Sequence, residues 1–283
     1  MDRKAALHDD DLDAPARPVD LVLPVVRVRR GAVDRSVSTD RLAEETPIAL
    51  QYNGISHATL LATPADLEDF ALGFSLTEGI IEAASDVRDI VLREEPEGIV
   101  VELEVASACF ARLKDRRRAM AGRTGCGLCG VETLGEVVRA APAVPPGPQV
   151  PMAALLAAHR EMRARQQLHD STGATHAAAF ADARGAVKAV REDVGRHNAL
   201  DKLVGALLRA GHDTRGGIVA VSSRASFEMV QKTAWSGAAV LAAISAPTAL
   251  AVRLADEAGL ALVGFLRGDD CTLYAHPERI DID

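Results

Sequence analysis

The sequence predicts an α/β protein, in which a mostly parallel or mixed β-sheet is covered by helices and preceded by a smaller α+β region. In the second half of the chain, strand patterns alternate with helical patterns. Helices of about 10–15 residues between strands are typical of such a sheet. In the first half, two hairpin patterns surround one helical pattern. A proline-rich stretch at 141–151 separates the two halves and is the expected linker.

This division predicts four segments. Residues 1–20 are charged, contain prolines and lack apolar periodicity, which favours a disordered leader. Residues 21–140 are expected to form the N-terminal α+β region, which ends in a loop that carries two cysteines. Residues 152–283 are expected to form the α/β domain, after the linker at 141–151.

The first element predicted in the N-terminal region is a hairpin at 48–62. Its turn is Asn53-Gly54, a pair that favours a primed two-residue turn. A helix follows, with Thr63 as its cap and Gly79 as its terminator. A second hairpin is expected at 89–105, and a basic helix at 108–120 leads into the cysteine loop.

The second half has the alternating pattern that defines the fold class. Helices are expected at about 151–166, 196–210, 225–237 and 247–258, and strands at 176–181, 187–191, 217–222, 239–244, 260–266 and 271–275. The loops that follow the strands should therefore meet near helix N-termini, where α/β sheets bind their ligands.

The overall charge and composition exclude several classes of function. The formal net charge is −8 and only 3% of residues are aromatic, so we expect no nucleic-acid partner. No apolar run is long enough for a membrane span. The N-terminal residues lack the apolar core of an export signal. We therefore expect a cytoplasmic protein, in which thiols serve chemistry or metals rather than structural disulfides.

Cys126 and Cys129 form a C-x-x-C pair among glycines at 122, 125, 127 and 130. Such a pair can bind one metal, form a redox disulfide, or act as a nucleophile and its assisting thiol. A zinc site would need two further ligands, and no second cysteine pair is present. A thioredoxin-like site would need the pair to open a helix. The glycine-rich loop and the nearby arginines favour a mobile, activated thiol, and we expect no structural metal.

Polar side chains gather in four loops of the second half, around His176, Asp193 to Lys202, Ser223-Arg224 and Arg267. Four cations, at Arg196, Lys202, Arg224 and Arg267, are expected to surround phosphate groups. Each group also has a structural alternative. His176 is equally compatible with a core position, Asp193 and Asn198 with helix caps, and Ser222 or Ser223 with a cap of the next helix.

These runs together resemble the FdhD family of formate dehydrogenase accessory sulfurtransferases. The resemblance rests on Gly125–Gly130, Thr172–His176, Glu192–Lys202, Ser223–Lys232 and Ser245–Ala255 continuing through Gly264–Arg267, and covers roughly residues 35–276. It implies a cytidine-deaminase-like fold for the α/β domain, and a homodimer. The zinc signature of true deaminases is missing, because no Glu lies two residues after His176 and no Pro-Cys-x-x-Cys follows.

The resemblance also implies a role for individual residues. Cys126 would carry sulfur from a cysteine desulfurase as a persulfide, and Cys129 would be the assisting thiol. The acceptor would be the bis(molybdopterin guanine dinucleotide) molybdenum cofactor of formate dehydrogenase, held as a bound substrate. The stretch implied to bind it comprises Phe265, Leu266, Arg267, Gly268, Asp269 and Asp270.

The remaining polar residues are assigned to the same cofactor by hypothesis. They are His176, Asp193, Arg196, His197, Asn198, Lys202, Ser223 and Arg224, with the cations on phosphates and Asp193 or Asp269 on a guanine edge. Three competing functions stay open: a cofactor chaperone that transfers no sulfur, a zinc-dependent nucleoside deaminase, and a redox sensor that uses the Cys126–Cys129 disulfide.

Overall fold

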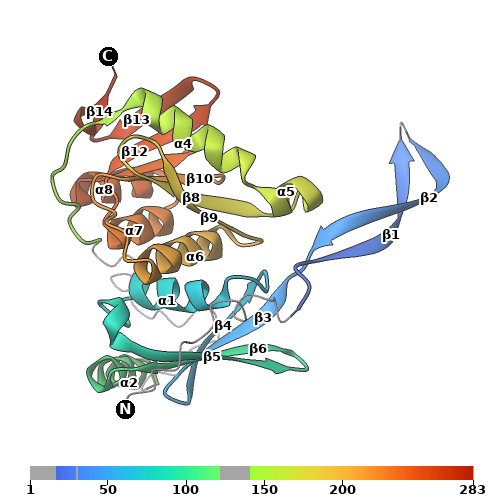
Figure 1. The fold of residues 1–283 in the computed structure, drawn as a ribbon, viewed down its shortest axis with the longest axis horizontal. Coiled ribbons are helices and arrows are strands. Elements are labelled where there is room, and N and C mark those ends of the chain that lie inside the picture. Colours follow the sequence, from blue (N-terminus) through green and yellow to red (C-terminus); the bar gives the residue numbers. More distant parts are fainter. Residues whose placement is uncertain (1–16, 30, 122–140, 283) are drawn as a thin grey trace, which may run out of the picture.

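Two main β-sheets, one of six strands and one of four, meet across a pair of helices (Figure 1). The computed structural model describes residues 17–29, 31–121 and 141–282. The six-stranded sheet is built from the second half of the chain, and the four-stranded sheet from the first. The predicted α/β class, with a smaller α+β region toward the N-terminus, is confirmed.

The six-stranded sheet has the order β13-β12-β11-β10-β8-β9. Its strands are β8 (His176–Ala181), β9 (Val187–Asp193), β10 (Ile218–Val221), β11 (Val240–Ala243), β12 (Ala261–Arg267) and β13 (Asp270–Ala275). The central strands β10, β11 and β12 are parallel; the antiparallel hairpin β8-β9 flanks β10, and β13 pairs antiparallel with β12 at the other side. The sheet is therefore mixed, as the sequence predicts.

Strand direction brings the polar loops to one edge of this sheet. The carboxyl ends of β10, β11 and β12 point the same way because the three strands are parallel. β8 runs antiparallel to β10, with Ala178 opposite Val221, so its first residue, His176, lies at that same edge. Asp193, the last residue of β9, is the partner of His176. We call this the carboxyl edge.

Helices cover both faces of the six-stranded sheet (Figure 1). α4 (Met152–Ala164) covers one face, and α6 (Arg196–Arg209), α7 (Phe227–Ser236) and α8 (Ala249–Ala258) cover the other. These elements agree with the predicted positions to within a few residues. A further short helix, α5 (Gln167–Thr172), was not expected.

The four-stranded sheet has the order β4-β3-β6-β5. Its strands are β3 (Thr46–Tyr52), β4 (Ile55–Ala62), β5 (Val87–Glu95) and β6 (Gly98–Val105), and α2 (Ser107–Ala121) follows. Both predicted hairpins and the predicted basic helix are therefore confirmed. Asn53 and Gly54 have φ values of 48° and 78°, the two positive values that a primed turn requires.

The helix between the two hairpins, α1 (Leu67–Thr77), begins later than expected. Thr63 is not its cap; Asp66 takes that position, with a left-handed backbone. The reason is that Thr63 is bonded elsewhere: its N–H donates to Asp193 Oδ2 at 3.0 Å, and its Oγ1 accepts from the N–H of Val194 at 3.2 Å. Gly79, with φ 62°, lies directly after the end of the helix, as predicted.

α1 and α6 cross in close contact at two glycines. A Cβ on Gly73 would lie 1.8 Å from the backbone oxygen of Asp201, and one on Gly205 would lie 1.8 Å from that of Asp69. Neither space can hold even a methyl group. This crossing joins the four-stranded sheet to the six-stranded sheet (Figure 1).

Buried charges surround the crossing. The Lys232 ammonium, from α7, lies 2.9 Å from both carboxylate oxygens of Asp201, and Thr77 donates to Asp201 at 2.7 Å. On the other side, the buried carboxylate of Asp69 accepts from Arg191 at 2.6 Å. Burial raises the pKa of Asp69, and the adjacent guanidinium opposes that rise. The first pair joins α7 to α6, with Thr77 of α1 bonded to it, and the second joins α1 to β9. Separating either pair would leave a charge buried and uncompensated.

An antiparallel hairpin of β1 (Asp20–Arg29) and β2 (Ala32–Ala43) projects from the body of the molecule (Figure 1). We call residues 20–43 the arm. The sequence analysis did not anticipate it, although the Leu and Val residues before Gly31 are a strand signal. Its two strands pair only with each other among the described residues.

The proline-rich stretch has no regular structure until β7 (Val150–Pro151), which pairs with β14 (Ile280–Asp281) near the C-terminus. The N–H of Val144, which is buried, donates to the carbonyl of Ala258 at 2.8 Å. The stretch thus runs along the second half of the chain. Its assignment as a linker between domains stays a prediction.

The helix crossing predicts the effect of one added methyl group. Gly73→Ala should destabilise the fold by at least about 1–3 kcal/mol, the usual cost of overpacking, because backbone atoms block the new Cβ. Gly147→Ala is the control, since its Cβ would meet Gly216 at an ordinary 3.7 Å. Urea denaturation of both variants measures the difference. Equal stability of the two would contradict the close crossing.

Candidate functional site

The loops at the carboxyl edge form a continuous rim. The N–H of Ser222 donates to the carbonyl of Ala177 at 3.0 Å, and the N–H of Phe265 donates to the carbonyl of Ser245 at 3.3 Å. Between them, the N–H of Ile244 donates to the carbonyl of Val221 at 3.3 Å. The structure therefore brings together the four polar loops that the sequence predicts to converge.

Three arginines on this rim have no carboxylate partner within ion-pair distance among the described residues. Arg224 and Arg267 are exposed, and the Nε of Arg196 is buried without a hydrogen-bond partner. Elsewhere in the described chain, cations such as Arg191 and Arg209 are paired with carboxylates. Uncompensated guanidinium groups that face one edge suit a multiply charged anion.

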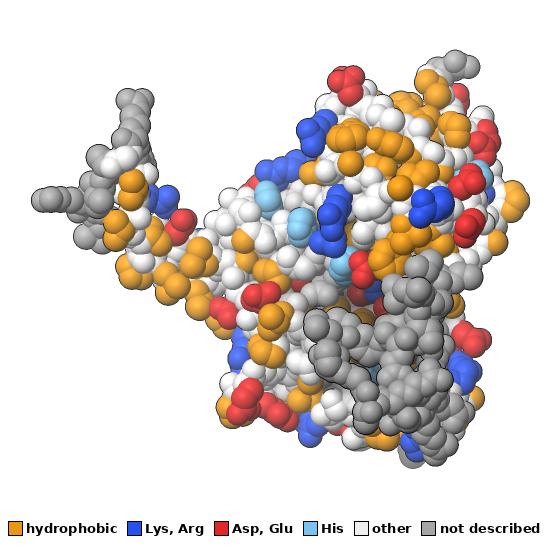
Figure 2. Space-filling view, turned by 180° about the vertical axis from the view of Figure 1, so that it is seen from behind, with side chains coloured by type: hydrophobic (Ala, Val, Ile, Leu, Met, Phe, Trp, Pro, Cys, Tyr) orange, Lys and Arg blue, Asp and Glu red, His pale blue; other side chains and the backbone are white. Residues whose placement is uncertain are grey.

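His176 lies half-buried near Arg196. Burial lowers its pKa, and the positive charge of Arg196 lowers that pKa further. The lowered pKa favours the neutral form of the His176 ring. Figure 2 shows histidine and basic side chains next to one another on one face of the molecule.

His197 forms a pair with Glu228, a residue that the sequence analysis did not select. The Nε2 of His197 lies 2.7 Å from Oε2 of Glu228, which belongs to α7. The hydrogen bond from His197 holds the pKa of Glu228 below its usual range. The pair orients the imidazole at the start of α6, and it can exchange a proton with a group bound at the rim.

Lys202 and Asp193 have a different role from the one expected. Lys202 is fully buried, and its Nζ lies 2.7 Å from Asp193 Oδ2 and 2.9 Å from the carbonyl of Thr63. The other oxygen of Asp193 accepts from the N–H of Gly195 at 2.7 Å. The expectation that Lys202 contacts a phosphate and Asp193 a guanine is therefore corrected: both side chains are engaged in joining the two halves of the chain.

Asn198 and Ser223 are buried as well. The Nδ2 of Asn198 donates to the carbonyl of Leu61 at 2.8 Å and to Asp193 Oδ1 at 3.0 Å. The hydroxyl of Ser223 donates to the carbonyl of Arg224 at 3.0 Å. Both side chains are thus hydrogen-bonded to groups of the protein itself. The N-cap of α7 is Ser226 rather than Ser222 or Ser223.

The stretch from Phe265 to Asp270 forms the turn between β12 and β13. Phe265 has a left-handed backbone, with φ 51°, and the residue is 41% exposed, whereas Leu266 is fully buried. The Arg267 guanidinium lies 6.0 Å from the Phe265 ring centre, and its Nε donates to the carbonyl of Ile244. A bulky residue at positive φ is strained, and here that backbone turns an aromatic ring outward.

The outer part of this turn is polar. Gly268 has a positive φ of 59°, and Asp269 and Asp270 are exposed. Asp269 lies 3.3 Å from Arg160 of α4, also exposed. Such a surface pair is weak, so Asp269 is free to exchange Arg160 for a ligand.

The loop 244–248, which follows β11, was not selected as site from the sequence. It lies in the middle of the rim, where a Cβ on Gly264 would meet Pro247 Cδ at 2.9 Å. The signal was present, because this loop also follows a parallel strand and precedes a helix.

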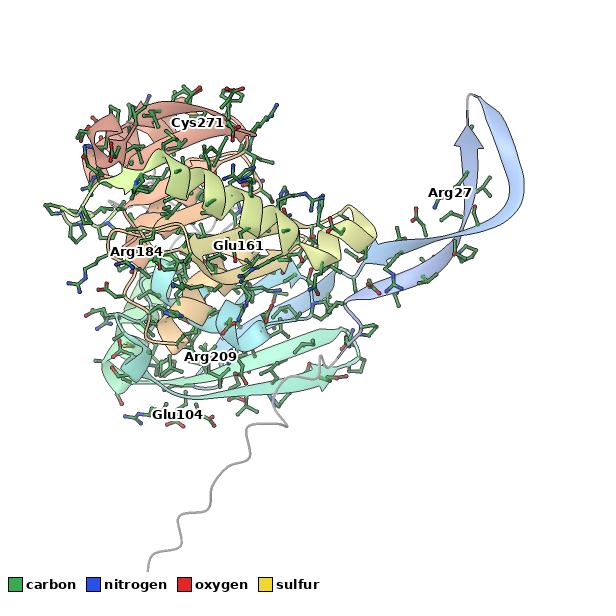
Figure 3. All side chains as sticks on the ribbon, turned by 45° about the horizontal axis from the view of Figure 1, so that its top comes forward. Arg27, Glu104, Glu161, Arg184, Arg209 and Cys271 are labelled. Atoms are coloured by element: carbon green, nitrogen blue, oxygen red, sulfur yellow. The ribbon has the colours of Figure 1, made fainter. Side chains whose placement is uncertain are left out.

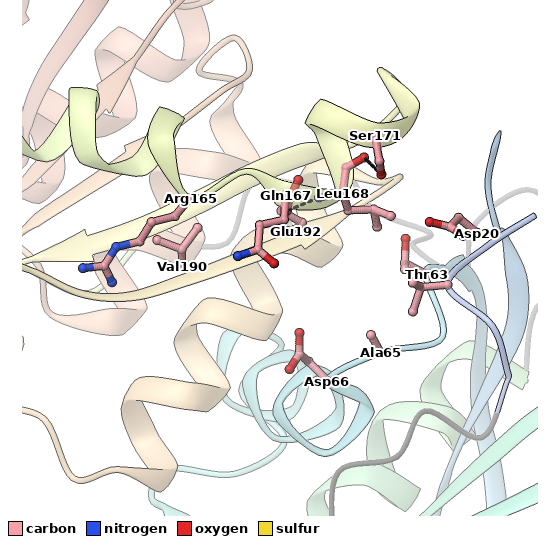
Figure 4. A pocket seen from close by; sticks show the side chains of 11 residues that line it. Asp20, Thr63, Ala65, Asp66, Arg165, Gln167, Leu168, Ser171, Val190 and Glu192 are labelled. Atoms are coloured by element: carbon pink, nitrogen blue, oxygen red, sulfur yellow. Dashed lines mark hydrogen bonds between the residues drawn. The ribbon is translucent and has the colours of Figure 1, made fainter. Parts of the chain in front are cut away.

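A cavity of about 350 Å³ lies near the carboxyl edge, between the base of the arm and α5 (Figure 4). Thr63, Asp66 and Glu192 contribute to its lining. The Glu192 carboxylate already accepts from the N–H groups of Leu168 and His169, at 2.9 and 2.8 Å. The hydrogen bonds of the Glu192 carboxylate are therefore made to the backbone of α5 and not to a group in the opening of the cavity.

Residues 43–281 match the model of the FdhD/NarQ family. The chain belongs to the FdhD/NarQ family. The sulfur carrier protein FdhD of Bordetella petrii is 63% identical, over 94% of this chain and 96% of that protein. The sulfur carrier protein FdhD of Cupriavidus necator is 57% identical, over 93% of this chain and 91% of that protein. The resemblance inferred from the sequence motifs is confirmed.

A solved structure supports the family fold. A crystal structure from Desulfotalea psychrophila, assigned as a formate dehydrogenase accessory protein, has a TM-score of 0.72 and 25% identity. The match covers 93% of this chain and 100% of that one. The arrangement of two sheets around α1 and α6 is thus the fold of an FdhD/NarQ relative.

Cys126 and Cys129, the predicted sulfur carrier and its assisting thiol, lie outside the described residues. Within the described ranges, no three His, Cys, Asp or Glu side chains are grouped to hold a metal ion. No helix in the described part of the chain is long and apolar enough to cross a membrane.

The rim predicts a measurable shift in one titration. Arg196→Ala should raise the pKa of His176, because it removes a nearby positive charge that disfavours the protonated ring. NMR titration of the histidine ring signals measures this change. Arg224→Ala is the control, since it removes an arginine from the same rim and should shift the His176 pKa less than Arg196→Ala does. An unchanged His176 pKa in Arg196→Ala would contradict the geometry of the rim.

Proposed function

We propose that this chain is a sulfurtransferase that carries sulfur as a persulfide on Cys126. It takes the sulfur from a cysteine desulfurase and passes it to the molybdenum of bis(molybdopterin guanine dinucleotide), for use by formate dehydrogenase. It works in the cytoplasm as a homodimer. The names of its FdhD relatives support sulfur carriage, and the formate dehydrogenase accessory relative supports the recipient.

The observation that carries the cofactor part of the proposal is the uncompensated charge at the carboxyl edge. Arg196, Arg224 and Arg267 lie on one rim and have no described carboxylate partner. A guanine dinucleotide cofactor supplies several phosphate oxygens for them. The exposed Phe265 ring offers a face for a base, and the neutral His176 can donate or accept one hydrogen bond.

The sulfur step follows the chemistry of thiol–disulfide exchange. The Cys126 thiolate attacks the outer sulfur of the donor persulfide, and a new S–S bond forms on Cys126. The S–S bond of the donor breaks, and the donor cysteine leaves as a thiolate, so no external oxidant or reductant is needed. Cys129 is the assisting thiol. The basic run that precedes the pair favours the thiolate form of Cys126.

Cys126→Ala should abolish sulfur loading while the fold is kept. Incubation with a cysteine desulfurase and cysteine should add the mass of one sulfur atom to the peptide that contains Cys126. Cys271→Ala is the control, because Cys271 packs against Met152, with its sulfur 3.8 Å from the Met152 sulfur. Mass spectrometry measures both. Cofactor binding without any sulfur on Cys126 would instead favour a chaperone that transfers no sulfur.

Arg267→Ala should weaken binding of a guanine nucleotide diphosphate about tenfold or more, as expected for loss of a charge-assisted hydrogen bond of about 1.5–3 kcal/mol. Arg184→Ala is the matched control, since Arg184 is equally exposed but lies in the turn between β8 and β9, at the opposite edge of the sheet (Figure 3). Calorimetry measures both affinities. An unaltered affinity in Arg267→Ala would count against the carboxyl edge as the nucleotide site.

A further inference from the structure

A second cavity, of about 440 Å³, lies along β9, the edge strand of the six-stranded sheet. Its polar lining residues are Arg165, Gln167, Lys188, Arg191 and His212, and small apolar residues of β9 and α6 complete the lining. None of the described residues that line it is acidic. Its volume is within the range of about 300–1,000 Å³ that is usual for small-molecule sites. In a chain with a net charge of −8, a cavity lined by three cations and no carboxylate suits an anion.

Two of these cations are held only by exposed carboxylates. The Lys188 ammonium lies 2.8 Å from Asp182, and Arg165 is paired with Glu161 of α4. Neither carboxylate lines the cavity. All four side chains are more than a third exposed, and ion pairs of this kind contribute little to stability. Figure 4 shows the guanidinium of Arg165 pointing away from the acidic residues of the neighbouring cavity. Both cations are therefore available to an anion in the second cavity.

The free edge of β9 adds a backbone donor. The polar backbone groups of successive strand residues point to opposite sides of the strand. The carbonyl of Ala177 faces β10, because it accepts from the N–H of Ser222, so the backbone groups of Ala178 face β9. Arg191, the partner of Ala178, therefore directs its backbone groups toward β8, and Val190 directs its own outward. Val190 lines the cavity.

The N–H of Val190 is open to a ligand, whereas its carbonyl is not. That carbonyl already accepts from Nη1 of Arg191 at 3.0 Å, and the same guanidinium donates to Asp69 at 2.6 Å. An added peptide strand would need the carbonyl as an acceptor, so the edge disfavours strand addition. On the other wall, the carbonyl groups of residues 206–208 accept from the N–H groups of residues 210–212. The cavity thus presents donors and positive charge.

We propose that this cavity binds a small phosphate anion of the size of pyrophosphate. Arg165 and Lys188 bind its oxygen atoms, and the N–H of Val190 donates to it. Arg191 contributes its charge while it stays bonded to Asp69. The lining shares no residue with the rim at the carboxyl edge, so this inference goes beyond the proposed function and does not depend on it.

The probe is inorganic pyrophosphate, and the measured quantity is the amide NMR signal of Val190 in the full chain. Arg165→Ala combined with Lys188→Ala removes the two exposed cations. Arg184→Ala is the matched control, because Arg184 is exposed in the turn before β9 and does not line the cavity. Arg267→Ala removes a cation of the rim, where pyrophosphate could also bind. Thermal unfolding checks that each variant folds.

Pyrophosphate should shift the Val190 signal of the wild-type chain to saturation. The dissociation constant should rise at least about tenfold in the double variant, because charge-assisted hydrogen bonds are lost, and should stay within about twofold in Arg184→Ala and Arg267→Ala. A Val190 signal that does not respond would overturn the inference. Equal weakening in the double variant and in Arg184→Ala would also overturn it, since it indicates unspecific attraction. Loss of the Val190 response in Arg267→Ala would assign the anion to the rim instead.

Discussion

The contact of the N-terminal half with α6 and α7 determines how the two sheets meet, and the candidate site depends on it. Gly73 and Gly205 allow the backbones of α1 and α6 to touch. Beside them, Lys202 joins Asp193, at the end of β9, to the carbonyl of Thr63, at the start of the α1 segment. Breaking such a buried pair typically costs about 3–5 kcal/mol. The network thus fixes the loop that leads into α6, and with it Arg196 and His197.

The charges of this chain divide into two groups by burial. Lys202 and Lys232 lie inside, each within 3 Å of a carboxylate oxygen. Arg224 and Arg267 lie outside, on the rim, and have no such partner in the described chain. A protein with a net charge of −8 can therefore still present a local positive surface to an anion. In the proposed function, that anion is the guanine dinucleotide cofactor.

Elements whose signals come from neighbouring residues could be predicted from the sequence, and features that depend on distant contacts could not. The Asn53-Gly54 turn and the alternating elements of the second half depend on neighbouring residues, and they were predicted. The beginning of α1 was not, because Thr63 is bonded to Asp193, which is 130 residues away. Lys202 was assigned to a phosphate for the same reason: only the fold reveals that it is buried against Thr63, in the segment between β4 and α1. The arm was missed because its exposed apolar side chains break the usual pattern of one buried face.

The direct backbone contact between α1 and α6 has a consequence for dissecting this protein. A fragment that begins at residue 152 would leave Lys232 and Asp201 on an open face, and would remove Thr63 from Lys202. A fragment that ends before 140 would expose the side of α1 that carries Asp69, whose arginine partners both come from the second half. Neither piece retains a complete interior, so we expect neither fragment to fold by itself.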